Sequence, residues 1–111
     1  MIVKDFQKIF DVSSPNKVDL IVTPTCFHDT ITYDEHLKQE QVFDERDFFT
    51  AIANISGLPA ISVPVRFSSK NQLPIGIQFI TAWEQDELLL NIADWFIKNN
   101  LSNYPYFDEL F

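Results

Sequence analysis

The spacing of hydrophobic residues changes several times along the chain, and each change predicts a new element. The first apolar residues recur at helical intervals, which predicts an amphipathic helix over residues 1–10 that ends before a Ser-Ser-Pro segment. A compact apolar stretch then predicts a short buried strand over 19–23, closed by Pro24, which cannot donate a hydrogen bond to a neighbouring strand. Residues 26–41 keep no sustained period, so we expect a surface loop with some helical turn there.

The next segments switch from a helical period to a strand period. A helix is predicted that Gly57 would end in a left-handed cap, because four apolar side chains before it lie at helical spacing. They are Phe48, Ala51, Ile52 and Ile55. Strict alternation then predicts strands over 60–65 and 75–80. The short polar bridge between them predicts an antiparallel hairpin, although Pro64 is unusual inside a regular ladder.

A last apolar stripe predicts a third helix that would cover the sheet. Thr81 followed by Glu84 has the spacing of a capping box at its start. The stripe consists of Leu88, Leu89, Ile92, Trp95 and Phe96. The order of elements predicts an α/β protein in which helices are layered on a mixed sheet. Three strands make a thin sheet, so we expect residues 1–111 to form a single partial domain.

Composition limits the classes of function. An apolar fraction of 46% with 11 Phe residues predicts a globular chain with a core. The net charge of −8 would repel a phosphate backbone, so direct binding of nucleic acid is not expected. The single cysteine, Cys26, can form no internal disulfide, which favours a reducing compartment. We expect no signal peptide and no membrane span, because charge interrupts the N-terminal apolar residues and no apolar run is long enough.

Short motifs for cofactors and nucleophiles are weak. Gly57 and Gly76 are the only glycines, too few for a phosphate-binding loop or a dinucleotide fingerprint. The acidic and histidine residues within 28–36 lack a recognised ligand spacing, so we expect no metal site. The run Ser68-Ser69-Lys70 fits a solvated hairpin tip better than a serine-lysine pair, because neighbouring residues point in different directions. Cys26 and a nearby histidine are too close in sequence to indicate a catalytic pair.

A longer ordered pattern exceeds what composition explains. From Thr50 the chain reads T-x-x-x-N-x-x-G-L-P-A-x-S-V-P, and from Leu73 it reads L-P-x-G-x-Q, with T-P-T ending the earlier strand. These motifs resemble the C-terminal part of the amidase-signature family over about residues 17–98. The matching positions are Thr50, Asn54, Gly57, Leu58, Pro59, Ala60, Ser62, Val63, Pro64, Leu73, Pro74, Gly76 and Gln78. The resemblance implies an α/β/α sandwich around a mixed sheet, of which this chain would supply the last strands and helices.

The resemblance singles out one substrate-binding candidate. Asp47, three residues before Thr50, resembles the acidic residue that contacts the amino group of bound glutamine in the tRNA-dependent amidotransferase branch of the family. A carboxylate can compensate an ammonium group for the hydration that it loses on binding. A structural alternative stays open, because Asp44 and Asp47 also fit the N-cap and third position of a helix. The family's catalytic serine, its second serine in a cis peptide bond and its lysine lie on a segment absent here, so we assign no catalytic residue.

That branch implies a glutamine-hydrolysing, ammonia-releasing subunit that serves conversion of Glu-tRNA(Gln) into Gln-tRNA(Gln). Glutamine would be the ligand, and the partners would be a B subunit together with a small accessory subunit. ATP, Mg²⁺ and tRNA would be bound by a partner, and this chain alone should be inactive. The residues after T-P-T depart from the bacterial pattern, which favours the mitochondrial matrix over a bacterial cytoplasm. Two alternatives remain open: a general amidase of the family, and a noncatalytic remnant or interaction subunit.

Overall fold

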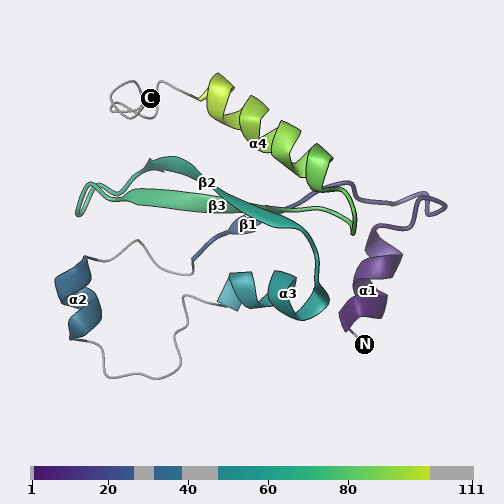
Figure 1. The fold of residues 1–111 in the computed structure, drawn as a ribbon, viewed down its shortest axis with the longest axis horizontal. Coiled ribbons are helices and arrows are strands. Elements are labelled where there is room, and N and C mark those ends of the chain that lie inside the picture. Colours follow the sequence, from purple (N-terminus) through teal and green to yellow (C-terminus); the bar gives the residue numbers. More distant parts are fainter. Residues whose placement is uncertain (1, 27–31, 39–47, 101–111) are drawn as a thin grey trace.

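The structure, a computed structural model, describes residues 2–26, 32–38 and 48–100, in which helices lie on both sides of a three-stranded sheet (Figure 1). This confirms the predicted layering of helices on a sheet. No helix among these residues is long and apolar enough to cross a membrane. In chain order the elements are α1 (Ile2–Ile9), β1 (Ile21–Pro24), α2 (Tyr33–Leu37), α3 (Phe48–Ser56), β2 (Ala60–Phe67), β3 (Pro74–Ile80) and α4 (Asp86–Asn99).

The sheet has the strand order β1-β3-β2, and both outer strands run antiparallel to β3. The predicted hairpin of β2 and β3 is therefore confirmed. All pairs among the described strands are antiparallel, so the parallel pairs expected of a mixed sheet are not among these three. Periodicity did not indicate that β1 would pair with β3, because that contact joins residues as far apart in the chain as Thr23 and Gln78.

The first strand ends at a proline on the outer edge of the sheet. Pro24 is the last residue of β1, and the next backbone N–H, that of Thr25, donates to the Gly76 carbonyl of β3 at 3.2 Å. Successive N–H groups of a strand point in opposite directions, so the nitrogen of Pro24 faces away from β3. The strand predicted at 19–23 is thus displaced towards Pro24, since a proline is tolerated at this position.

The other two prolines of the sheet also lie where a missing N–H is tolerated. Pro64 belongs to the outer strand β2, and the register of that strand shifts between Pro64 and Arg66, which is a bulge. Pro74 is the first residue of β3. The expectation that Pro64 would disturb a regular ladder is therefore confirmed, because the bulge follows it directly.

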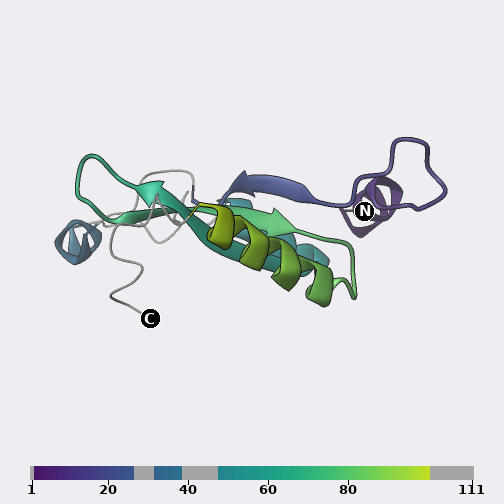
Figure 2. The ribbon, with the colours of Figure 1, turned by 90° about the horizontal axis from the view of Figure 1, so that it is seen from above.

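The main core lies between the sheet and α4. It is formed by Val63 and Phe79 from the sheet and by Leu89 and Ala93 from the helix. The rings of Phe79 and Phe96 meet edge to face with centroids 5.5 Å apart. Burial of one such large side chain contributes about 1.5–3 kcal/mol. Figure 2 shows from above that α4 lies over the sheet, whereas α1 lies beyond the end of the sheet.

The start of α4 contradicts the predicted capping box. Gln85 is the N-cap residue, and its side chain makes no capping hydrogen bond. Glu84 has a φ of 65°, so it belongs to the turn before the helix and not to its third position. Thr81 is fully buried, and its hydroxyl lies 3.5 Å from the Gln85 carbonyl oxygen. The prediction was wrong because the chain makes a further turn between Ile80 and the first residue of α4.

The apolar stripe predicted for α4 is only partly buried. The sheet-facing line runs through Leu89, Ala93 and Phe96, while Trp95 is 63% exposed and Leu88 is also exposed. The described sheet is narrow, so it covers only part of the stripe. Spacing alone marks a face as apolar without fixing the angle at which the helix packs.

The end of α3 confirms the predicted cap. Gly57 has a φ of 73°, in the left-handed region that favours glycine. Its backbone N–H and that of Leu58 both donate to the Ala53 carbonyl, at 2.8 and 3.2 Å. The Trp83 indole Nε1 donates to the Ser56 carbonyl at 3.1 Å, which attaches this end of α3 to the segment after β3.

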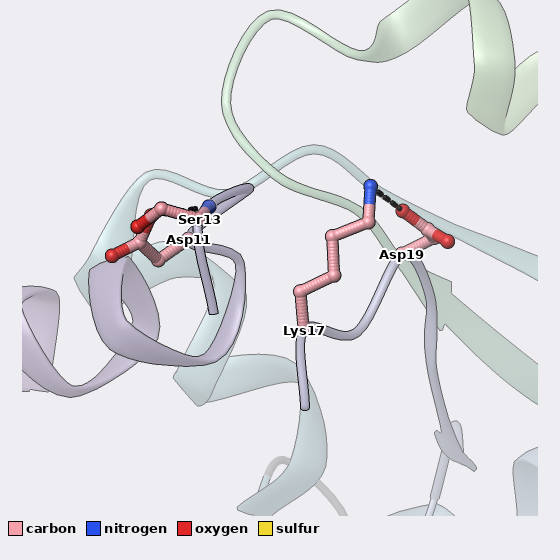
Figure 3. A network of polar contacts seen from close by, with 4 residues as sticks. All are labelled: Asp11, Ser13, Lys17 and Asp19. Carbon is pink, nitrogen blue, oxygen red and sulfur yellow. Dashed lines mark hydrogen bonds and ion pairs between the residues drawn. The ribbon is translucent and has the colours of Figure 1, made fainter. Parts of the chain in front are cut away.

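Local polar contacts shape the connection between α1 and β1 (Figure 3). The Asp11 carboxylate accepts hydrogen bonds from the Ser13 hydroxyl at 2.7 Å and the Ser13 backbone N–H at 2.9 Å. The bond from the hydroxyl, and to a smaller extent the bond from the backbone N–H, lowers the pKa of Asp11 below its usual value. Lys17 and Asp19 form a solvent-exposed ion pair at 3.2 Å, which contributes little to stability.

Candidate functional site

Polar side chains form a row across the sheet. Thr23 of β1 and Ser62 of β2 both lie opposite Gln78 of β3. Residues directly opposed in an antiparallel sheet point to the same face, so the three share one face. This face is the one towards α3, because Gln78 reaches a carbonyl of that helix. Thr25 follows Thr23 by two residues and contacts Ser62, so it belongs to the same face. We call Thr23, Thr25, Ser62 and Gln78 the polar row.

Gln78 joins three elements through one amide group. The residue is 4% exposed, and its side-chain Nε2 donates to the Thr23 hydroxyl oxygen at 3.0 Å and to the Phe49 carbonyl at 3.2 Å. Both N–H groups of the amide therefore have acceptors. The Thr23 hydroxyl in turn donates to the Pro24 carbonyl at 2.9 Å. The amide thus attaches the first turn of α3 to β3 and to β1.

A hydroxyl pair lies beside the backbone of Gly76. Thr25 Oγ1 and Ser62 Oγ are 2.6 Å apart and connect the two outer strands across β3. A Cβ added to Gly76 would lie 2.6 Å from Ser62 Oγ and 3.0 Å from Thr25 Oγ1. The first of these distances is far below van der Waals contact. A side chain at 76 would therefore force the Ser62 hydroxyl to move, because the two hydroxyls occupy the space that a Cβ would take.

The polar row consists of neutral groups only. Threonine, serine and glutamine do not titrate at ordinary pH, so the row supplies hydrogen-bond donors and acceptors and no acid or base. No buried side-chain nitrogen or oxygen among the described residues lacks a partner. The chemistry of this face is therefore positioning, because its groups hold backbone segments in place.

The acidic candidates from the sequence lie outside the described residues. This applies to Asp47 and Asp44, and also to residues 28–31 of the polar loop. The helix α3 begins at Phe48, directly after Asp47 in the sequence. In the part of the chain that is described, no three potential metal ligands gather.

The run from Ser68 to Lys70 lies in the β2–β3 hairpin, where the Ser68 N–H donates to the Leu73 carbonyl at 2.8 Å. This confirms the hairpin, but the expectation that all three residues are solvated was wrong for Ser68. Ser68 itself is 1% exposed, so only Ser69 and Lys70 lie on the solvated tip. The Ser68 hydroxyl oxygen accepts a hydrogen bond from the Lys70 backbone N–H at 3.2 Å, which is a turn contact and not the activation of a nucleophile.

The polar row was missed as a unit by sequence reasoning. Ser62, Gly76 and Gln78 were recognised only as motif positions. Their even numbers, and the odd numbers of Thr23 and Thr25, place each set on one face of its strand. That alternation was the available signal. Its significance depends on the pairing of β1 with β3, which alternation does not reveal.

Comparison with known proteins gives the class to which this fold and these motifs belong. The family model described as Amidase matches residues 1–90. The chain therefore belongs to the amidase family, and the resemblance found in its motifs is confirmed.

Individual proteins of known sequence are similar to this chain over most of its length. The chain is 40% identical over 100 residues to the A subunit of the mitochondrial glutamyl-tRNA(Gln) amidotransferase of Bos taurus, and 38% identical to that of Homo sapiens. Each alignment covers 88% of this chain and 18% of the relative, so this chain spans about a fifth of the relatives' length.

Solved structures agree with these relatives. The crystal structure of the A subunit of glutamyl-tRNA(Gln) amidotransferase from Thermotoga maritima matches with a TM-score of 0.72 and 34% identity. That match covers 94% of this chain and 20% of the other. 6-Aminohexanoate cyclic dimer hydrolase matches with a TM-score of 0.61 and 30% identity, over 76% of this chain and 20% of the other. The amidase-family fold is thus supported by both sequence and structure.

Proposed function

We propose that this chain is part of the glutamine-hydrolysing A subunit of a mitochondrial glutamyl-tRNA(Gln) amidotransferase. The observation that carries the proposal is its 40% identity over 100 residues to the mitochondrial A subunit of Bos taurus. The structural match to the Thermotoga maritima protein supports it, since that match covers more of the chain than the match to the cyclic dimer hydrolase. In this function the complete protein releases ammonia from glutamine.

Partners and cofactors follow from the same proposal. A B subunit would use the ammonia to convert Glu-tRNA(Gln) into Gln-tRNA(Gln), with a small accessory subunit in the complex. ATP, Mg²⁺ and tRNA belong to the partner in this scheme. The composition of this chain supports that division, because its two glycines make no phosphate loop and its net charge is −8. The mitochondrial matrix is the proposed location, since the Bos taurus and Homo sapiens relatives are mitochondrial.

Asp47 is the proposed contact to the glutamine ammonium group. Its position immediately before α3 supports this role, because the next turn of the chain is attached to the sheet by the Gln78 bond to the Phe49 carbonyl. A carboxylate near an ammonium group compensates for the water that the ammonium loses on binding.

The test is Asp47→Asn in the complete amidotransferase, with glutamine and ammonia assayed as separate nitrogen sources. This substitution keeps the shape of the side chain and removes its charge. A hydrogen bond to a charged group contributes about 1.5–3 kcal/mol, so glutamine-dependent kcat/KM should fall roughly tenfold to a hundredfold. Ammonia-dependent synthesis should persist, because free ammonia bypasses the glutamine pocket.

Asp86→Asn is the matched control. Asp86 lies in the first turn of α4, where an exposed acid interacts with the helix dipole by about 0.3–1 kcal/mol. The control should keep normal glutamine kinetics. Loss of stability with unchanged glutamine kinetics in Asp47→Asn would make Asp47 a helix-capping residue. Turnover of an apolar amide without glutamine-dependent synthesis would support a general amidase.

A further inference from the structure

The side chain of Gln78 makes two hydrogen bonds in addition to the backbone pairing of its strand. Its amide is buried, and it joins the carbonyl of Phe49 in α3 to the hydroxyl of Thr23 in β1. A carbonyl within a helix already accepts a hydrogen bond from the N–H four residues later. The Gln78 bond therefore uses the second lone pair of the Phe49 oxygen, and its main effect is to fix where the helix begins relative to the sheet.

The two ends of α3 are attached by separate side-chain donors. Trp83 Nε1 donates to the Ser56 carbonyl at the C-terminal end, at 3.1 Å, and Gln78 donates to the Phe49 carbonyl at the N-terminal end, at 3.2 Å. Loss of one donor should therefore loosen one end while the other remains attached. The N-terminal end is the one that Asp47 precedes in the sequence.

We propose that Gln78 is a positioning residue for glutamine binding, which holds the first turn of α3, the turn that follows Asp47 in the sequence, at a fixed place on the sheet. This inference rests on the proposed function. In this role Gln78 acts through the backbone of α3, because its amide donates to the Phe49 carbonyl. Thr23 shares the role, because its hydroxyl is the second acceptor of the same amide and is itself fixed by the Pro24 carbonyl.

The test uses Gln78→Met in the complete amidotransferase, because methionine has a similar length and no donor. Loss of a neutral hydrogen bond should raise KM for glutamine about threefold to tenfold, with kcat at saturating glutamine nearly unchanged. Ammonia-dependent activity should remain at the level of the unmodified enzyme. Trp83→Phe is the matched control, since it removes a bond of the same kind at the opposite end of α3, and its KM for glutamine should stay normal.

A second pair of variants protects the test against misfolding of Gln78→Met. Thr23→Val removes one acceptor of the amide and should also raise KM, whereas Thr23→Ser keeps the hydroxyl and should restore the normal value. An equal rise in KM for Gln78→Met and Trp83→Phe would overturn the inference, because it would indicate general loosening of α3. A normal KM in both Gln78→Met and Thr23→Val would overturn it as well.

Combination with Asp47→Asn separates this inference from the proposed function. If Gln78 acts through Asp47, the change in KM caused by Gln78→Met should largely vanish in the Asp47→Asn background. Full additivity would overturn the positioning role while leaving the proposed function intact. Absence of any glutamine-dependent activity in the unmodified complex would reject the proposed function itself. Amide hydrogen exchange then tests the attachment directly, and unaltered exchange in the first turn of α3 in Gln78→Met would count against it.

Discussion

Two hydroxyl groups lie close to Gly76, and this explains the glycine of the family motif L-P-x-G-x-Q. Gly76 lies in the central strand, and the hydroxyls of Thr25 and Ser62 meet at 2.6 Å beside it. Any side chain at this position would separate the two hydroxyls or displace β1. The glycine of L-P-x-G-x-Q is thus explained by space, since its φ is not in the left-handed region.

Gly76→Ala should therefore destabilise the complete protein by about 1–3 kcal/mol, the usual cost of forcing extra atoms into a packed site. The measurement is urea unfolding followed by fluorescence. Ser62→Ala combined with Gly76→Ala removes the nearest clashing atom, so the double variant should be less destabilised than the sum of the single variants. Stability equal to that of the unmodified protein in Gly76→Ala would contradict this account of the site.

At the scale of elements, the two ends of α3 are fixed by different means. Its C-terminal end depends on Gly57 at a φ of 73°, while its other end depends on the side chain of Gln78. The first feature is local and was predicted from the sequence, because a glycine after an apolar helical stretch is a common stop. The second is not local, since Gln78 lies 29 residues after Phe49.

Gly57→Ala and Gly57→Asn should separate conformational strain from loss of space. An added Cβ has room, because its nearest contact is Trp83 Nε1 at 3.8 Å. Alanine in the left-handed region costs roughly 1–2 kcal/mol, and asparagine tolerates this region better. We expect Gly57→Ala to lower the unfolding free energy by that amount and Gly57→Asn to lower it by less. Equal losses in a denaturant titration would show that the φ value is not the cause.

At the scale of the whole molecule, much apolar surface is exposed. Val22 on the outer strand β1 is 55% exposed, and Trp95 and Leu90 of α4 are exposed too. Large apolar side chains that stay exposed favour association with other apolar surfaces. Among the described strands, β1 and β2 are the edges of the sheet, and strand edges can pair with a strand of another chain.

The 111-residue chain by itself should therefore associate in solution. Size-exclusion chromatography with light scattering should give a mass above the 12.9 kDa of one chain, and the excess should grow with concentration. Val22→Lys and Trp95→Lys should reduce association, whereas Lys70→Arg at an exposed position should not change it. A monomer with a sharp cooperative melt would show that the chain is self-sufficient despite these surfaces.

Local sequence features determined the elements of this protein and their order. Periodicity placed α1, α3, α4 and the β2–β3 hairpin, and Gly57 marked the end of α3, because each of these depends on neighbours within a few residues. The amidase motifs also identified the family, which the family model confirms over residues 1–90.

Only the tertiary structure decided which distant segments meet. The pairing of β1 with β3 brings Thr23 to Gln78 across 55 residues of sequence, and it assembles the polar row. The packing of α4 on the sheet decided which part of the α4 stripe is buried, so that Leu89 is covered and Trp95 is not. The physical reason is that hydrophobic periodicity specifies a face of an element but not its partner, and a buried amide acquires its acceptors only when those partners are in place.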